Sequence, residues 1–274
     1  MNLCPFCGHR LPPQRIQKCP ECGKNIDAHC ARVYRENGNR LLEVENYDEA
    51  LQNIDKAIEF DPNYADAWAR LCLIYLDEHR FNHNPRPNPL VRALTAARRA
   101  VELDPTSQLG RSALAQAYFF RHELDAFLPE LERALALNPN DVGTLAGVGT
   151  NLLYAGDERG ITLIRRAMAL DPFHPPLLYS VIAHYHFERG EYEEALAAAR
   201  KGDVPGFYYT HLLLAAIYAE LGRQSEAQSA LEEFLRLWPG CTIETWTEQM
   251  RIWNYRDDGR GHWVAALRKA GLPE

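Results

Sequence analysis

The sequence lacks any run of 18 or more apolar residues, so no membrane-spanning helix is expected among its 274 residues. It also lacks a secretory leader, because Cys4 and Cys7 stand where an apolar segment would have to be. The GxSxG, P-loop and HExxH motifs are missing, and no spacing pairs two carboxylates for acid–base chemistry. These absences predict a cytoplasmic protein that is not an enzyme.

Positive charge is scarce, and it is unevenly distributed along the chain. The formal net charge is −7, yet residues 1–24 carry a balance of +3, which leaves −10 for the remainder. An acidic body argues against extensive contact with nucleic-acid phosphates. A local contact through the small basic N-terminal segment stays open.

The seven cysteines do not form the even set of a disulfide scaffold, because four of them fall within residues 4–22. These four make two CxxC pairs separated by eleven residues, which suits the tetrahedral thiolate site of structural zinc. Gly8 and Gly23 follow the pairs and permit tight turns around the metal. The segment resembles a zinc ribbon, and the predicted ligands are Cys4, Cys7, Cys19 and Cys22.

Other interpretations of this segment are open. A redox dithiol would need a βαβ setting that the sequence does not indicate, whereas an iron site of rubredoxin type uses the same ligand pattern. His29 and Cys30 are alternative ligands, but they fall at the start of the first expected helix. Arg10, Arg15 and Lys18 lie between the CxxC pairs, so the ribbon is also a candidate nucleic-acid contact.

A repeated marker follows the cysteines: an apolar residue, then Asp or Asn, then Pro. It ends at Pro62, Pro105, Pro139 and Pro172, with weaker copies at Pro205 and Pro239. The period is about 34 residues throughout if "HRFNHNPRPNP" (79–89) contains an insertion of about nine residues. Each period holds two helix-length stretches with apolar residues at helical spacing, and the proline ends the second.

These periods resemble tetratricopeptide repeats. One copy reads Trp68-x2-Leu71-Cys72-x2-Tyr75, followed by alanines at helical spacing and Pro105. The resemblance implies an all-α, right-handed superhelix of about six helix pairs with a concave face. The predicted organisation is a zinc ribbon at 1–28, six repeats at 31–239, and C-terminal capping helices at 240–274.

The C-terminal segment has two apolar stripes at helical spacing. One contains Ile243, Trp246 and Met250, and the other contains Trp263 and Leu267. They predict two helices that seal the last repeat, although an aromatic partner-binding surface is an alternative. The ending "LRKAGLPE" resembles the tail of tetratricopeptide regions attached to bacterial class III nucleotide cyclases.

In tetratricopeptide proteins the first helix of each repeat lines the concave face, so the resemblance implies a set of groove residues. Arg35 and Asn39 match positions of the subfamily that grips C-terminal carboxylates, but Arg70 replaces an Asn and the third repeat lacks the basic pair. Burial of the groove against neighbouring helices or the chain's own C-terminal segment is the alternative. The candidates are Arg35, Asn39, Arg70, Leu109, Ser112, Gln116, Phe119, Gly143, Ala146, Gly147, Thr150, Leu153, Leu177, Ser180, Val181, His184 and Phe187.

The groove candidates combine small residues, which leave room for a guest backbone, with a few polar and aromatic anchors. We therefore predict a scaffold or adaptor that binds a peptide or partner domain, with Zn²⁺ in the ribbon as the cofactor. The main alternative is a nucleic-acid-associated regulator whose ribbon contacts nucleic acid and whose repeats recruit partners. His184 and His186 are two residues apart on a helix, so they are not expected to act as a catalytic or metal pair.

Overall fold

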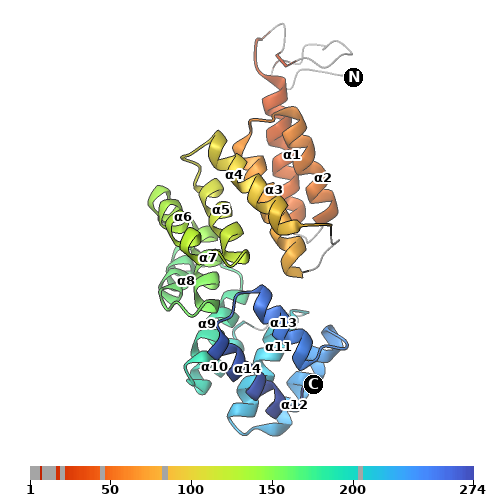
Figure 1. Ribbon diagram of the computed structural model, residues 1–274, viewed down its shortest axis with the longest axis vertical. Helices are drawn as coiled ribbons and strands as arrows, with labels where there is room; N and C mark the ends of the chain where they lie inside the picture. The colour runs from red at the N-terminus through yellow and green to blue at the C-terminus, as the bar shows by residue number, and fades with distance from the viewer. Residues whose placement is uncertain (1–6, 8–16, 19–21, 44–46, 82–85, 203–205) are drawn as a thin grey trace. The chain divides into compact units, whose positions relative to one another are not determined.

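The computed structural model describes residue 7 and residues 17–18, 22–43, 47–81, 86–202 and 206–274, and its regular elements there are all helices (Figure 1). The predicted all-α class is therefore confirmed for the described residues. In chain order the helices are α1 (Ile26–Glu43), α2 (Tyr47–Phe60), α3 (Ala65–Phe81), α4 (Pro89–Leu103), α5 (Gln108–Phe120), α6 (Leu124–Leu137), α7 (Val142–Tyr154), α8 (Arg159–Leu170), α9 (Leu177–Glu188), α10 (Tyr192–Ala199), α11 (Tyr208–Glu220), α12 (Gln224–Leu237), α13 (Ile243–Ile252) and α14 (Asp257–Ala270).

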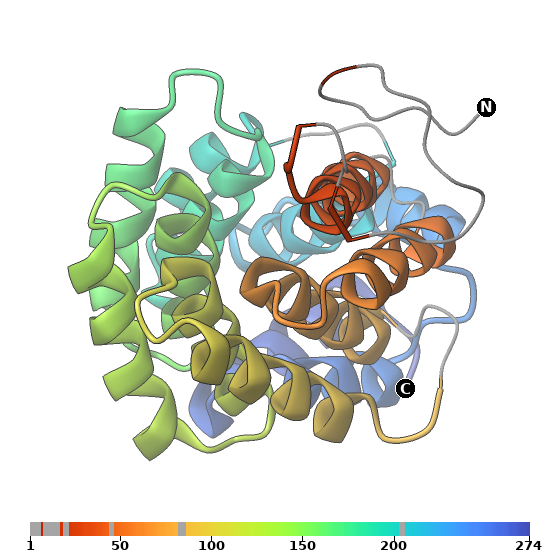
Figure 2. The same cartoon turned by 90° about the horizontal axis from the view of Figure 1, so that it is seen from above.

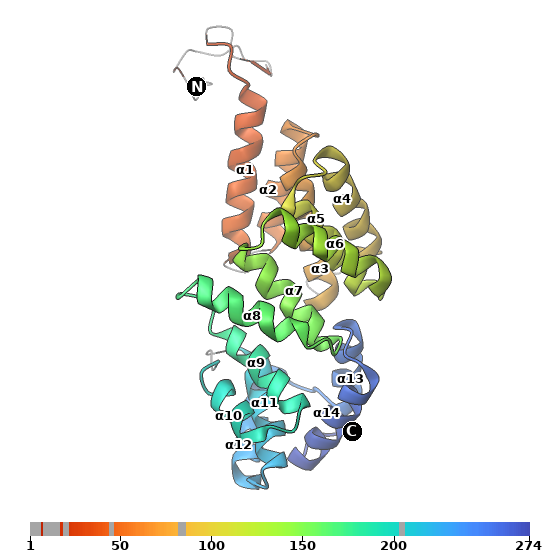
Figure 3. The ribbon, with the colours of Figure 1, turned by 90° about the vertical axis from the view of Figure 1, so that its left-hand side faces the viewer.

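The chain divides into two compact units, Met1–Leu137 and Asn138–Glu274. Successive helices pack as pairs, and each of the six predicted repeats corresponds to one pair from α1–α2 to α11–α12. Figure 2 looks nearly along α1, which lies beside α2 and also contacts α3. In the second unit, α14 lies beside α11 (Figure 3).

The repeated proline marker ends helices where it was expected to do so. α2, α4, α6 and α8 each end on the apolar residue of the marker, and the Asp or Asn that follows leaves the helix. Proline lacks an amide hydrogen and disfavours α geometry in the residue before it, so the helix cannot continue.

A small residue on each helix of the first pair allows the two helices to approach closely. A Cβ atom on Gly38 of α1 would lie 2.8 Å from Ile54 Cδ1 and 3.2 Å from the carbonyl oxygen of Ala50 on α2. The expected role of these small positions is therefore confirmed in this pair. A methyl group at Gly38 would push the two helices apart.

The predicted insertion is partly helical, because α3 continues to Phe81. The carboxylate of Glu78 is buried in the last turn of α3 and pairs with Arg86, beyond the end of that helix, and with Arg92 on α4. Both guanidinium groups lie over the ring of Tyr75. The extra residues are thus fastened at their C-terminal end by a buried, doubly paired acid.

The predicted C-terminal helices are confirmed as α13 and α14. The Thr242 hydroxyl caps α13 by accepting a hydrogen bond from the amide of Thr245. The Thr245 hydroxyl in turn accepts a hydrogen bond from the amide of Thr242. The end of the chain returns to the start of α13, where the Ile243 amide donates to the Pro273 carbonyl at 2.7 Å. The side chains of Trp246, Met250, Trp263 and Leu267 are buried in the core of the second unit.

Candidate functional sites

The predicted zinc site is only partly within the described residues. Cys4 and Cys19 lie outside them, whereas Cys7 is exposed and Cys22 is partly exposed. His29 and Cys30 lie in the first turns of α1, as the sequence predicted. The zinc ligands therefore stay a prediction.

The segment around the second CxxC pair is closed by backbone pairing. Lys18 and Asn25 form an antiparallel bridge, and the Ile26 amide donates to the Gln17 carbonyl at 2.8 Å. Gly23 within this loop has φ of +70°, a left-handed conformation that a side chain disfavours. Of the second CxxC pair, this part of the chain includes only Cys22, which lies next to Gly23.

In the first unit, five of the predicted groove residues keep partial exposure on the first helices of their repeats. They lie on α1, α3 and α5, and α3 contacts both of the other helices. The first-unit face is defined here by Arg35, Asn39, Arg70, Leu109 and Gln116.

Two predicted groove residues of α5 are not on this face. Phe119 has no exposed surface and packs in the core against Phe120 and Phe127, with ring centroids 5.2 and 5.4 Å away. Ser112 is also buried. Their side chains stabilise the helix pair and are not available to a partner.

The two polar groove candidates of α1 differ in their contacts. Arg35 Nε donates to the Tyr64 hydroxyl at 3.0 Å, and the guanidinium lies over the Tyr64 ring. Asn39 Oδ1 is buried and accepts no hydrogen bond from the described residues. A buried acceptor without a donor costs free energy, and its burial also keeps this oxygen out of reach of a guest.

In the second unit, the predicted groove residues divide between α7, where Gly143 is exposed and Ala146 partly exposed, and α9, where most of them are buried. Gly147 and Thr150 are partly exposed and Leu177 is exposed, but Ser180 has no exposed surface. The Ser180 hydroxyl lies 2.9 Å from Thr210 Oγ1 on α11, which itself bonds to the carbonyl of Gly202. Ser180 therefore joins repeats together instead of facing a guest. The other predicted groove residues of this unit that are buried are Leu153, Val181, His184 and Phe187.

The chain's own C-terminal helix covers α9. The Phe187 ring stacks on His262 with centroids 4.4 Å apart and planes 6° apart, and His184 stacks on Trp263 at 5.8 Å. Both partners belong to α14. At these two positions the C-terminal segment buries predicted groove residues, so His184 and Phe187 are core residues.

His184 is also the centre of a buried polar cluster. Its Nδ1 lies 3.1 Å from the hydroxyl of Tyr209, and that hydroxyl lies 3.1 Å from the hydroxyl of Tyr255. Burial, assisted by the nearby His262, lowers the pKa of His184 to about 3. The imidazole is therefore neutral at physiological pH. His186, two residues further on, contacts Glu191.

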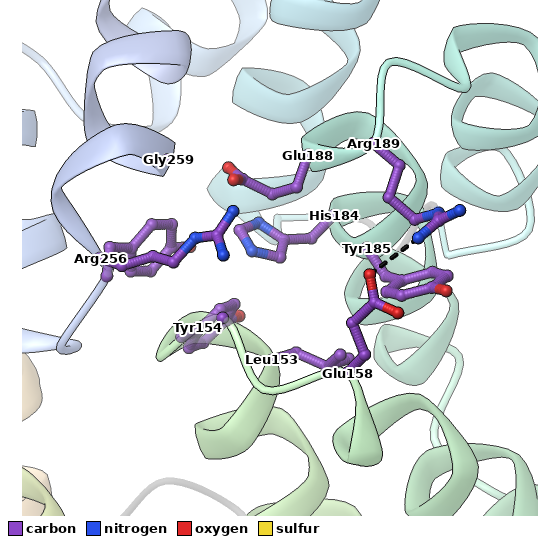
Figure 4. A pocket seen from close by; sticks show the side chains of 11 residues that line it. Leu153, Tyr154, Glu158, His184, Tyr185, Glu188, Arg189, Arg256 and Gly259 are labelled. Carbon is purple, nitrogen blue, oxygen red and sulfur yellow. Dashed lines mark hydrogen bonds and ion pairs between the residues drawn. The ribbon is translucent and has the colours of Figure 1, made fainter.

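A small pocket beside this cluster was not predicted. Its volume is about 60 Å³, and Figure 4 shows the Arg256 guanidinium reaching between Glu188 and Tyr154 toward His184. Ligand pockets usually measure roughly 300–1,000 Å³, so this one fits the end of a single side chain. The lining comes from α7, α9, α14 and the turns that follow α7 and α13, namely Leu153, Tyr154, Gly156, Glu158, His184, Tyr185, Glu188, Arg189, Tyr255, Arg256 and Gly259.

Glu188 is the unusual acid of the pocket. Burial raises the pKa of its carboxyl to about 7, against the lowering effect of Arg256, while the nearby Asp258 raises it further. Its Oε1 and the indole Nε1 of Trp263 are both buried, and the indole, as a hydrogen-bond donor to the carboxyl group, lowers the pKa of Glu188. No spacing rule connects Glu188 with Arg256, so the sequence carried no signal for this pocket.

Comparison with known proteins supports the repeat interpretation. Residues 208–240, which contain α11 and α12, match the family model described as tetratricopeptide repeat. The chain resembles the crystal structure of the APC/C hetero-tetramer Cut9-Hcn1, with a TM-score of 0.66 and 18% identity over 81% of this chain and 42% of that one. The fold is that of tetratricopeptide repeats.

Two curated proteins are similar to this chain in sequence. The TPR repeat-containing protein YpiA of Bacillus subtilis is 26% identical, and the match covers 80% of this chain and 58% of that protein. The Hsp70-Hsp90 organizing protein 3 of Arabidopsis thaliana is 26% identical over 49% of this chain and 23% of that protein. The chain therefore spans less than two thirds of either relative.

One further structural finding concerns membranes. Within the described residues, every helix falls short of the length and apolarity needed to span a bilayer.

Proposed function

We propose that the chain is a non-catalytic scaffold or adaptor that binds a peptide or a partner domain on the first-unit face. The observation that supports this is the contrast between the inner helices of the two units. α9 in the second unit is covered by α14, whereas the first-unit face keeps partly exposed polar side chains. Related repeats occur in a protein named for organising Hsp70 and Hsp90, which is in keeping with protein partners in general.

The chemistry of the first-unit face favours a partner segment with acceptor groups. Arg35 and Arg70 supply positive charge from α1 and α3, although the rest of the chain is acidic. Gln116 on α5 is partly exposed and can both donate and accept hydrogen bonds. An extended peptide presents alternating amide donors and carbonyl acceptors, and this set of side chains matches them.

Site-specific photo-crosslinking tests this proposal. A benzoyl-phenylalanine at Gln116 should trap a partner in cells, and Arg35→Ala with Arg70→Ala should lower the yield at least tenfold. The control carries the crosslinker at Glu132, an exposed residue of α6. The proposal is wrong if Glu132 traps the same protein equally well or if the double variant leaves the yield unchanged.

The zinc ribbon is proposed as a structural cap of the first repeat or as a second docking site. Four thiolates close the coordination sphere, so the metal would hold the segment together without binding a substrate. Purified full-length chain should contain one zinc per molecule, and Cys19→Ser should remove it with little change in helical circular dichroism. Absence of zinc from the unmodified protein would contradict the assignment.

The alternative of a nucleic-acid contact is tested on the same protein. Lys18 is exposed just before the second CxxC pair in the sequence, and the N-terminal segment is basic. If the ribbon binds nucleic acid, a mobility shift with the zinc-loaded chain should weaken steeply between 50 and 200 mM salt. A missing or salt-insensitive shift would remove this alternative.

A further inference from the structure

A turn joins α8 to α9 in the second unit (Figure 3), and its most exposed side chain is apolar. Phe173 leaves 94% of its surface exposed, more than any other large apolar residue that the structure describes. Leu170 at the end of α8 and Leu177 at the start of α9 are also exposed, at 43% and 41%. Single exposed apolar residues are ordinary in proteins, but three of them within residues 170–177 form a patch that is better buried than left in water.

The backbone of this turn matches that of the other marker turns of the chain. In all four turns, the amide of the residue after the marker proline donates to the side-chain oxygen of the preceding Asp or Asn, at 2.9–3.1 Å. In the other three turns this residue is polar, namely Asn63, Thr106 and Asn140. The turn therefore forms equally well without an aromatic side chain, and Phe173 has no role in forming it.

The turn holds Phe173 in a defined position. Asp171 Oδ1 accepts the Phe173 amide at 2.9 Å, and the Asp171 carbonyl accepts the amide of His174 at 3.1 Å. Three prolines within residues 172–176 fix their own φ angles. The His174 ring packs edge-on against Tyr179, with centroids 5.3 Å apart. Little backbone entropy is therefore lost when a partner encloses the phenyl ring.

Basic side chains without acid partners flank the turn. Arg166 on α8 donates to the amide oxygen of Asn140 at 2.8 Å, which is a neutral partner. Lys201, just after α10, places its Nζ 5.7 Å from the centre of the Tyr179 ring, and neither cation pairs with a carboxylate of the described residues. Residues 160–177 contain two arginines and a single acid, so this end of the second unit is positive although the chain carries −7.

We propose that Phe173 is the anchor of a second docking site, whose occupant is a partner protein with an apolar socket for one phenyl ring, bordered by carboxylates. Burial of an exposed ring favours association, and a rigid aromatic anchor surrounded by polar contacts carries much of the binding energy of protein interfaces. Arg166 and Lys201 complement a carboxylate rim, which speeds association and selects the partner.

Other occupants match these features less well. A membrane has no socket, and stable attachment to it takes two strong signals, whereas this turn supplies one aromatic ring and a few cations. The acidic remainder of the chain is also repelled by an anionic bilayer. Two copies of the chain that met through this turn would bring their own Arg166 and Lys201 side chains together, which repulsion between like charges disfavours.

The inference rests on the proposed function only in that the occupant is a protein, and it concerns the other unit. Arg35→Ala with Arg70→Ala should lower crosslinking from Gln116 without affecting crosslinking from residue 173. Replacement of Phe173 should do the reverse. The two proposals therefore fail separately.

The first experiment places benzoyl-phenylalanine at residue 173 of the full chain in cells. The control carries the same crosslinker at Asn63, the corresponding exposed residue of the first marker turn. Adducts specific to residue 173 are digested, and mass spectrometry of the crosslinked peptide should place the ring in an apolar segment with carboxylates beside it. The proposal is overturned if residue 173 traps nothing beyond what Asn63 traps, or if the adduct is a second copy of the chain.

The trapped protein is then purified, because capture alone does not establish the site. Phe173→Ser should weaken its affinity at least tenfold and leave thermal unfolding unchanged, since the exposed ring contacts little of its own chain. Arg166→Glu with Lys201→Glu should also weaken binding at least tenfold, whereas Arg251→Glu, at an exposed position of α13, should have a much smaller effect. Equal affinity of Phe173→Ser, or tighter binding by the charge-reversed double variant, contradicts the proposal.

Vesicles separate a protein partner from a lipid surface. The full chain is mixed with vesicles of phosphatidylcholine and phosphatidylserine in equal parts and sedimented. No more of the chain should sediment than with phosphatidylcholine alone. Binding to the anionic vesicles that disappears in Phe173→Ser would replace the protein socket with a membrane surface and overturn the proposal.

Discussion

The two units use the same kind of helix pair, but they differ in how exposed the side chains on the first helices of the repeats are. In the first unit, α1, α3 and α5 present partly exposed polar residues such as Arg35 and Gln116. In the second unit, aromatic residues of α14 pack against Phe187 and His184 of α9, and both of these residues are buried in the core. A repeat fold therefore specifies where a groove can be, but an appended segment decides whether it stays open.

The largest expected effect removes the cover of the second unit. Trp263 has no exposed surface and stacks on residues of α9, so Trp263→Ala should lower the free energy of unfolding by about 3–5 kcal/mol. Hydrogen exchange should show faster exchange of amides in residues 138–274 and little change in residues 1–137. Equal acceleration in both units would contradict the division into two units.

The corresponding variant in the first unit also removes a buried aromatic ring. Phe119→Ala removes a fully buried ring from the cluster with Phe120 and Phe127, with a similar cost of about 3–5 kcal/mol. Its exchange pattern should be the reverse of that of Trp263→Ala. A variant that folds normally and only loses a partner would restore Phe119 as a groove residue.

A smaller effect concerns the pH dependence of folding stability that Glu188 contributes in the second unit. Because the pKa of Glu188 is raised from 4.5 to about 7 in the folded chain, protonation stabilises the folded state. This contribution is complete below about pH 4.5 and is lost as the pH rises through 7. Glu188→Gln should remove up to about 3 kcal/mol of that pH dependence and make the chain more stable than the unmodified one at pH 8.

Urea unfolding at pH 6 and pH 8 measures this difference. The matched control is Glu194→Gln, whose exposed carboxyl should leave the pH dependence unchanged. If Glu188→Gln loses as much stability between pH 6 and pH 8 as the unmodified chain, the carboxyl is not protonated in the fold.

The smallest effect compares helix approach in the two units. A Cβ atom on Gly160 would lie 2.4 Å from the backbone oxygen of Gly149, so Gly160→Ala should cost about 1–3 kcal/mol. Gly38→Ala in the first unit should cost less, because it meets the flexible end of Ile54 at 2.8 Å. In Gly147→Ala the added methyl group meets open space, so the free energy of unfolding should rise by about 0.8 kcal/mol. Thermal unfolding of the three variants gives the order.

Much of the fold followed from local rules in the sequence. The Asp-Pro and Asn-Pro markers located the ends of α2, α4, α6 and α8, because proline acts on its own helix. The apolar stripes at Ile243–Met250 and Trp263–Leu267 located the last two helices for the same reason. Phe119 and Phe187 were placed in a groove because helical position alone does not state what packs on each face.

The sequence by itself determined the helix pairs and their period, since these depend on near neighbours along the chain. It also predicts four cysteine ligands for zinc from their spacing. Only the tertiary structure decided that α14 covers α9, and that Glu188, Arg256 and Tyr154 meet around a pocket. These contacts join residues from separate helices. The raised pKa of Glu188 arises from the same packing, because burial and its neighbours exist only once the second unit has folded.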